Sequence, residues 1–138
     1  MKTGLVGEKL GHSFSREIHS LLGNTEYRNF EMPREELAGF MARRDFDGVN
    51  VTIPYKTDVI PMLDYVSDEA RAIGAVNTVV NRDGRLYGYN TDFFGMRELL
   101  IKNNIPVCGG DVLILGTGGT SKTAKAVCES LGAGSVTK

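Results

Sequence analysis

The feature that most constrains the fold is an apolar run that ends in a glycine-rich turn. Residues 111–115 read DVLIL, and a continuous apolar run of this kind is typical of a parallel strand buried on both faces. The sequence GTGGT at residues 116–120 then turns the chain, and residues 121–131 have helical spacing. Residues 135–137 begin another strand. The sequence therefore predicts one strand–helix–strand unit of a doubly wound α/β domain.

The preceding residues alternate between strand-like and helix-like segments. We predict strands over residues 2–6, 26–32, 46–52, 76–81 and 85–89. We predict helices over residues 15–22, 33–43 and 91–103, a helix after Pro54 and another that begins at Ser67. The hairpin dipeptide Asp83-Gly84 separates the last two strands. In the helix over residues 91–103, the side chains expected to face inward are Phe94, Leu99 and Leu100.

A domain boundary is predicted at the polar stretch around Asn103 to Pro106. The fold class is α/β, with residues 1–103 forming a three-layer domain around a mostly parallel or mixed sheet. Residues 104–138 then hold the first strand–helix–strand unit of a Rossmann-like domain. Because a doubly wound domain needs several such units, the chain is expected to be a truncated form.

Composition excludes several classes of protein. The formal net charge of −1 gives no field that would attract nucleic acid or an anionic membrane, and no apolar run approaches the ~20 residues of a membrane span. The apolar stretch at the N-terminus is too short for a signal peptide. Cys108 and Cys128 lack metal-ligand spacing, so we expect no metal site. These features predict a cytoplasmic protein.

The glycine loop is a candidate dinucleotide site. A strand, the pattern Gly116-x-Gly118-Gly119 and a helix follow one another, as a dinucleotide fingerprint requires. Glycines let backbone N–H groups approach a pyrophosphate, and a helix N-terminus favours its negative charge. Ser121 replaces the third glycine of the strict pattern. The alternative is a tight turn without a ligand. The residue that selects NAD or NADP is expected ~20 residues after the loop, at a position beyond Lys138, so the choice between the two cofactors stays open.

Lys56 and Asp92 are the candidate acid–base pair. Each follows a predicted strand and lies where a helix is predicted to start, and such positions converge on one crevice of an α/β sheet. Oxidation of an alcohol removes a hydroxyl proton as a hydride departs, and a partly neutral lysine can take that proton. A neighbouring carboxylate would hold the lysine in place. The alternative is a surface lysine and an unrelated helix-capping aspartate.

Other polar residues at strand ends are candidates for ligand binding. Ser13 and Ser15 would project together from an extended backbone and could hold a carboxylate, or Ser15 could simply cap the next helix. Thr52, Asn77 and Asn90 could bind hydroxyl groups or stabilise turns. His12 and His19 have no common metal-ligand spacing, and we interpret both as structural or solvated.

Five segments resemble, in wording and order, the shikimate dehydrogenase family. They are HSFS at residues 12–15, NVTIPYK at 50–56, GAVNT at 74–78, GYNTD at 88–92 and GTGGT at 116–120. The resemblance implies reversible NADPH-dependent reduction of 3-dehydroshikimate to shikimate, a step in the synthesis of aromatic amino acids. The first domain, residues 1–103, would then bind shikimate, and residues 104–138 would begin the NADP-binding domain.

The resemblance also assigns roles to residues. The serines at Ser13 and Ser15 would hold the shikimate carboxylate, and Lys56 and Asp92 would form the catalytic pair. The substrate-binding residues are Ser13, Ser15, Thr52, Asn77 and Asp92. The cofactor-binding residues are Gly116, Thr117, Gly118, Gly119 and Thr120. One departure is Arg16, where the family usually has proline, which is expected to loosen the serine loop without removing its hydroxyls.

Two alternatives accompany this interpretation. A quinate/shikimate dehydrogenase shares the catalytic pair, and a non-catalytic module could keep the small-ligand crevice without turnover. The 138-residue chain is expected to be inactive alone. Because the strand at residues 111–115 would normally be covered by further helices, residues 111–138 are expected to be disordered, to swap onto another copy or to pair with one in a dimer.

Overall fold

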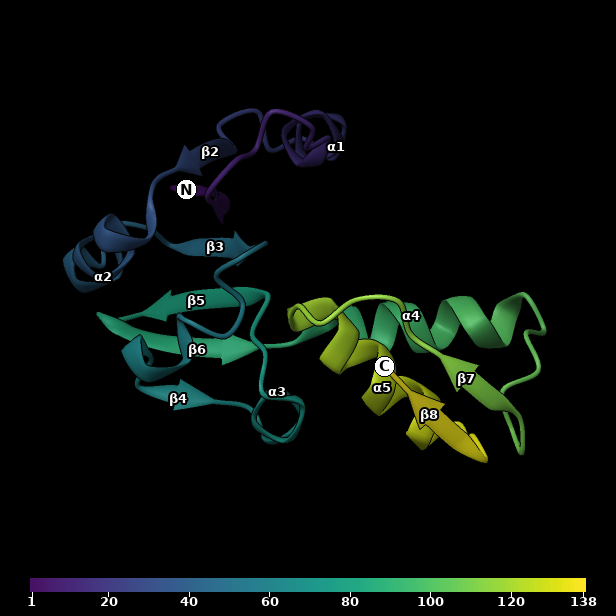
Figure 1. The fold of residues 1–138 in the computed structure, drawn as a ribbon. Helices are drawn as coiled ribbons and strands as arrows, with labels where there is room; N and C mark the ends of the chain where they lie inside the picture. The colour runs from purple at the N-terminus through teal and green to yellow at the C-terminus, as the bar shows by residue number, and fades with distance from the viewer.

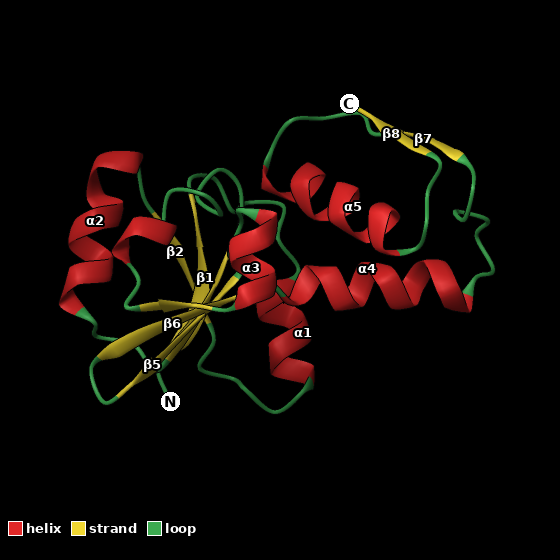
Figure 2. Ribbon diagram, turned by 90° about the horizontal axis from the view of Figure 1, so that it is seen from below, coloured by secondary structure: helices red, strands yellow, loops and turns green.

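The computed structural model describes all residues from Met1 to Lys138 as two neighbouring lobes (Figure 1). The first lobe holds a six-stranded mixed sheet in the order β2-β1-β3-β5-β6-β4, and the second holds a two-stranded sheet of β7 and β8. In Figure 2 the helix α2 lies on one side of the large sheet, and α1 and α3 lie on the other. The predicted α/β fold with a mixed sheet is confirmed.

The elements follow the predicted order, apart from the short strand β4, which was not predicted, and the segment after Pro54. The strands are β1 (Thr3–Gly7), β2 (Arg28–Glu31), β3 (Gly48–Val51), β4 (Tyr65–Val66), β5 (Thr78–Arg82), β6 (Arg85–Tyr89), β7 (Asp111–Leu113) and β8 (Ser135–Thr137). The helices are α1 (Ser15–Leu21), α2 (Arg34–Arg43), the 3₁₀ helix η1 (Ile60–Met62), α3 (Asp68–Ile73), α4 (Thr91–Lys102) and α5 (Gly119–Ser130). None of the helices has the length and apolar character that crossing a membrane requires.

Strand direction brings the polar segments to one edge of the large sheet. β1 and β3 run parallel, β5 is antiparallel to β3, and β6 is antiparallel to β5. The pairs Asn50 with Thr78 and Thr78 with Tyr89 therefore place the end of β3, the start of β5 and the end of β6 side by side. The loop after β1 starts from this same edge, because β1 is parallel to β3.

The core of the first lobe lies between the sheet and the segment that holds α2 and η1. Val6, Val51 and Val79 contribute sheet residues that are almost fully buried, and Leu37 and Met41 come from α2. The segment between β3 and η1 joins the same core through Tyr55 and Val59. Burial raises the pKa of the Tyr55 phenol, which donates a hydrogen bond to the Met32 carbonyl.

The predicted helix after Pro54 is wrong. Residues 53–59 form turns, and only the short η1 follows them. Pro61 explains the difference, because a proline disfavours the α conformation at the residue before it and cannot donate a helical hydrogen bond. Only a few residues separate Pro54 from Pro61, which is too short a segment for a stable helix.

Two predicted inward-facing residues of α4 are exposed instead. Phe94 is 57% exposed and Leu99 is 62% exposed, while Leu100 is half-buried, as are Phe93 and Met96. The half-buried residues follow helical spacing, so the packed stripe of α4 shares Leu100 with the predicted one but contains Phe93 and Met96 in place of Phe94 and Leu99. This stripe belongs to a helix that packs along α5, and the two helices lie side by side in both views.

The second lobe is ordered in this structure. β7 and β8 pair in parallel, with α5 as the connection between them. The expectation of disorder for residues 111–138 is therefore wrong, whereas exchange or pairing between copies stays a prediction. The strand ends at Leu113, and both Leu113 and Leu115 are largely exposed rather than buried.

Replacement of glycine by alanine is expected to have opposite effects on stability at two positions, Gly4 and Gly39. A Cβ at Gly4 would overlap the Arg28 carbonyl oxygen, so Gly4→Ala should push β1 and β2 apart and lower the free energy of unfolding by about 3 kcal/mol. In α2, a Cβ at Gly39 meets its nearest neighbour, the Arg43 side chain, at 3.8 Å. Gly39→Ala should therefore raise stability by ~0.5–1 kcal/mol. Urea unfolding of both variants measures the difference, and equal effects would contradict the predicted contact at Gly4.

Candidate active site

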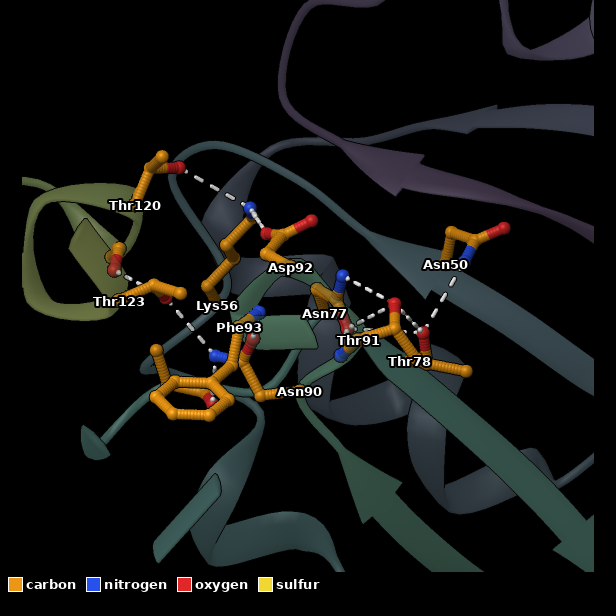
Figure 3. A network of polar contacts seen from close by, with 12 residues as sticks. Asn50, Lys56, Asn77, Thr78, Asn90, Thr91, Asp92, Phe93, Thr120 and Thr123 are labelled. Atoms are coloured by element: carbon orange, nitrogen blue, oxygen red, sulfur yellow. Dashed lines mark hydrogen bonds and ion pairs between the residues drawn. The ribbon is translucent and has the colours of Figure 1, made fainter. Parts of the chain in front are cut away.

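The predicted acid–base pair forms in the structure. The Lys56 Nζ atom lies 2.5 Å from the Asp92 Oδ2 atom, and the exposed fractions of the two side chains are 11% and 32% (Figure 3). The pair joins residues that are 36 positions apart in the sequence. A cation and a carboxylate in direct contact, largely shielded from water, are suited to moving a proton to or from a bound ligand.

Local structure explains how each partner reaches this position. Lys56 lies in the turns after β3, and its backbone carbonyl accepts a hydrogen bond from the Val76 N–H at 2.7 Å. It therefore does not start a helix as predicted. Asp92 lies in the first turn of α4, whose N-cap is Asn90. The Asn90 side chain accepts the Phe93 N–H, which fixes the turn that carries Asp92.

Asn77 is held in a polar network beside this pair (Figure 3). Its Oδ1 atom accepts the Thr91 N–H at 2.9 Å and the Thr78 hydroxyl at 3.0 Å, and its Nδ2 atom donates to the Thr91 hydroxyl at 2.9 Å. Farther along the sheet edge, Asn50 donates weakly to Thr78 at 3.4 Å. These bonds fix the amide of Asn77 and leave one of its N–H groups for a ligand.

The network continues to a buried tyrosine. The Tyr27 hydroxyl donates to the Asn50 Oδ1 atom at 2.8 Å, and burial raises the pKa of Tyr27 to about 12. The phenol therefore stays a neutral donor at physiological pH. The His19 ring stacks on Tyr27 with 3.8 Å between ring centroids, which agrees with a structural interpretation of that histidine.

The predicted serine pair lines a cavity of about 520 Å³ together with Thr52 and His12. The hydroxyls of Ser13 and Ser15 lie 3.1 Å apart, and Ser13 accepts the Ser15 N–H. The N-cap of α1 is Phe14 and has no side-chain cap, so the alternative of Ser15 as a helix cap is not what the structure has. Two hydroxyls at one wall of an open cavity can donate to the two oxygens of a carboxylate.

The glycine loop opens α5 beside the acid–base pair. Gly118 is the N-cap of α5, and no atom lies within 4 Å of a Cβ built on Gly116 or Gly118. The loop is therefore open enough for its N–H groups to approach a phosphate. Ser121 is buried, and its hydroxyl donates to the Gly118 carbonyl at 2.7 Å, consistent with a small residue packed against the turn.

Sequence reasoning did not identify Thr91 as a contributor, and it placed Thr120 in the cofactor loop without predicting its contact with Lys56. Thr91 binds Asn77 and lies between Asn90 and Asp92, so its position inside the GYNTD segment was an available signal. Thr120 accepts a hydrogen bond from Lys56 Nζ at 3.2 Å across 64 positions of sequence, and no local signal could reveal that contact.

Other parts of the surface contribute nothing to this cluster. A cavity of about 660 Å³ lies between β2 and α2 and contains none of the predicted site residues. No group of three or more His, Cys, Asp or Glu side chains could hold a metal ion. Cys128 is buried on α5, and burial raises the pKa of its thiol, so it is an inert packing residue.

Comparison with known proteins gives consistent matches. The family model described as "Shikimate dehydrogenase substrate binding domain" matches residues 5–79. A curated shikimate dehydrogenase (NADP(+)) from Clostridium beijerinckii is 45% identical over 127 residues, which cover 86% of this chain and 47% of that protein. The protein of the same name from Carboxydothermus hydrogenoformans is 44% identical over 129 residues, 87% of this chain and 46% of that protein. The chain thus spans about half the length of the curated relatives it matches.

Solved structures agree with the sequence matches. Shikimate dehydrogenase 1 from Peptoclostridium difficile superposes with a TM-score of 0.89 at 45% identity, covering 99% of this chain and 54% of that one. A shikimate 5-dehydrogenase from Thermus thermophilus, solved in complex with NADP(H) and shikimate, gives a TM-score of 0.88 at 36% identity, covering 99% and 55%. A quinate dehydrogenase from Corynebacterium glutamicum in complex with NAD gives 0.80 at 28% identity, covering 97% and 52%.

Proposed function

The chain belongs to the shikimate dehydrogenase family, since the family's substrate-binding domain model matches more than half of its residues, and we propose that it carries the shikimate-binding and proton-transfer machinery of an NADP-dependent shikimate dehydrogenase. The reaction is the reversible reduction of 3-dehydroshikimate to shikimate. The observation that carries this proposal is the Lys56–Asp92 pair at 2.5 Å, located between the polar network around Asn77 and the glycine loop.

We assign substrate binding and dinucleotide binding to different parts of the chain. Residues 1–103 bind the substrate, and residues 104–138 begin the dinucleotide-binding domain. α4 connects them, because its first turn carries Asp92 at the sheet edge and the helix packs along α5. The substrate therefore lies between a site built on the large sheet and the loop at residues 116–120.

The substrate is held by groups that match its chemistry. Ser13 and Ser15 donate to its carboxylate, because their hydroxyls lie 3.1 Å apart at one wall of the same cavity. Thr52 lines that cavity and binds a ring hydroxyl. Asn77 and Asp92 bind further hydroxyls through the free N–H of the amide and the free carboxylate oxygen.

Lys56 moves the proton. When shikimate is oxidised, the Lys56 amine takes the proton from the reacting hydroxyl and becomes an ammonium, and in the reverse direction this ammonium returns a proton to the carbonyl oxygen. Asp92 keeps the amine in place through their 2.5 Å contact. The N–H groups of residues 118–120, at the N-terminus of α5, would hold the dinucleotide pyrophosphate. The nicotinamide, when bound, supplies or accepts the hydride.

Calorimetric titration with shikimate tests the proposal. Micromolar-to-millimolar binding of shikimate, weaker binding of quinate, and NADP-dependent oxidation of shikimate by the intact gene product are expected. Equal use of quinate would instead favour a quinate/shikimate dehydrogenase, and binding without turnover would favour a non-catalytic module. Absence of shikimate binding would refute the proposal.

The proposed binding of the substrate carboxylate by Ser13 and Ser15 leads to a separate prediction. Ser13→Ala and Ser15→Ala should each weaken shikimate binding by about tenfold, the effect of losing roughly 1–2 kcal/mol from a hydrogen bond to a charged group. Thr25→Ala, at an exposed turn outside the site, is the matched control and should bind normally. A shikimate analogue without the carboxylate should bind both serine variants as well as it binds the unmodified chain. Equal losses with that analogue would assign the serines a different role.

A further inference from the structure

The Lys56 amine is held at two points rather than one. Besides the Asp92 contact, Nζ donates to the Thr120 Oγ1 atom at 3.2 Å (Figure 3). A lysine ammonium has three N–H groups and rotates freely about its last carbon–nitrogen bond. One acceptor leaves that rotation open, whereas two acceptors fix it. Besides its bond to carbon, the nitrogen has three positions. Two of them point at Asp92 and Thr120, so the remaining one, which is left for a substrate hydroxyl, has a defined direction.

The Asp92 side of the pair is connected by hydrogen bonds to the first turn of α5, which also carries Thr120. Thr123, which is fully buried, accepts from the Asn90 side chain at 3.1 Å and donates to the Gly119 carbonyl at 3.4 Å. Asn90 also donates to the Ala75 carbonyl at 3.0 Å and accepts the N–H of Phe93. The turn of α4 that carries Asp92 is therefore connected through Asn90 and Thr123 to the glycine loop.

The glycine loop also contacts the lysine stem. A Cβ at Gly119 would lie 2.8 Å from the Cβ atom of Lys56 and 3.3 Å from its Cδ atom. The absence of a side chain at Gly119 thus lets the loop pack directly on Lys56. Three features of one turn, at residues 119, 120 and 123, contact the lysine or the helix cap that carries its partner.

We propose that the first turn of α5 positions the Lys56–Asp92 pair, with Thr120 as the positioning residue that orients the Lys56 amine and Thr123 as the residue that fixes the Asn90 cap. This inference rests on the proposed proton transfer for its catalytic consequence, but not for its geometry. The first turn of α5 would then have two functions. It begins the proposed dinucleotide site, and it orients the amine that transfers the proton.

Thr120→Val is the decisive variant. Valine has nearly the shape of threonine, and residue 120 is exposed, so the change removes the acceptor without threatening the fold. Thr120→Ser keeps a hydroxyl and should restore the contact. Ser130→Ala is the matched control, because it removes a hydroxyl from the far end of the same helix, where the Ser130 side chain bonds only to the Val127 carbonyl.

The amine itself provides a readout that needs no substrate. In nitrogen–proton correlation spectra of the ¹⁵N-labelled 138-residue chain at low temperature, the Lys56 amine should give a signal protected from exchange with water, assigned by its loss in Lys56→Arg. Thr120→Val should speed that exchange about tenfold, the effect expected from losing one hydrogen bond to a charged group. Thr120→Ser and Ser130→Ala should leave the exchange rate within about twofold of the unmodified chain.

The outcomes separate this inference from the proposed function. An unprotected Lys56 amine in the unmodified chain, or the same exchange rate in Thr120→Val, overturns the positioning role. Failure of the chain to bind shikimate refutes the proposed function and leaves the exchange measurement intact. Where the intact gene product turns over, Thr120→Val should lower kcat about tenfold with the shikimate KM nearly unchanged, and Thr120→Ser should restore kcat.

Discussion

Replacing Lys56 with alanine should lower turnover by roughly 10²–10⁴-fold while changing shikimate affinity much less. In the proposed mechanism Lys56 transfers the proton, whereas other residues hold the carboxylate and ring hydroxyls of the substrate. Lys56 is also buried and paired with Asp92, so the substitution removes the amine that contacts this carboxylate. Steady-state kinetics of shikimate oxidation and calorimetric titration with shikimate measure the two quantities separately.

Controls distinguish lost chemistry from lost structure. Where residues 1–138 alone give no turnover, the kinetics are measured after fusion of the chain to the C-terminal half of the Peptoclostridium difficile relative, whose other half it matches with a TM-score of 0.89. Lys102→Ala, at an exposed lysine at the end of α4, should keep normal turnover. If Lys56→Ala keeps the turnover of the unmodified protein, Lys56 has no part in the mechanism.

A polypeptide limited to residues 1–138 should bind shikimate and give no detectable NADPH oxidation with 3-dehydroshikimate. All the proposed substrate contacts described above lie within these residues. By contrast, the second lobe has only β7 and β8, and a dinucleotide ordinarily spans both halves of a doubly wound sheet. The loop at residues 116–120 can then contact a pyrophosphate, whereas the nicotinamide half of such a site is ordinarily built by further strands.

The measurement combines calorimetry with the loss of NADPH absorbance. Fusion to the C-terminal half of the relative should restore NADPH oxidation, and Lys56→Ala in the same fusion should abolish most of it. NADPH oxidation by residues 1–138 alone would contradict the prediction, because it would mean that this lobe binds the nicotinamide without further strands.

Local sequence signals predicted an element correctly where a single residue type determines the backbone conformation. The hairpin at Asp83-Gly84 has positive φ angles at both residues, as the dipeptide predicts. Ser67 caps α3 through a hydrogen bond from the Ala70 N–H. The predicted helix after Pro54 does not form, because Pro61 disfavours the helical conformation of the residue before it in spite of the apolar spacing.

Apolar periodicity located helices but not always their buried faces. α1 and the residue after it carry Ile18, Leu21 and Leu22 at helical spacing, yet all three are exposed, and Leu21 is 89% exposed. In α4 two of the three residues expected to face inward are exposed, and only Leu100 is half-buried. A helical pattern says that a face is apolar, but which neighbour covers it depends on where the chain places the other elements.

The sequence by itself determined the α/β class, most of the order of the elements and the candidate site residues, because glycine, proline, capping and apolar spacing act within a few positions of the chain. Only the tertiary structure decided which of those residues meet. Lys56 reaches Asp92 across 36 positions and Thr120 across 64, and both contacts depend on strand order and on how α5 packs beside the sheet edge. Such contacts have no local sequence signal, since they are fixed by the summed packing of segments that are distant in the chain.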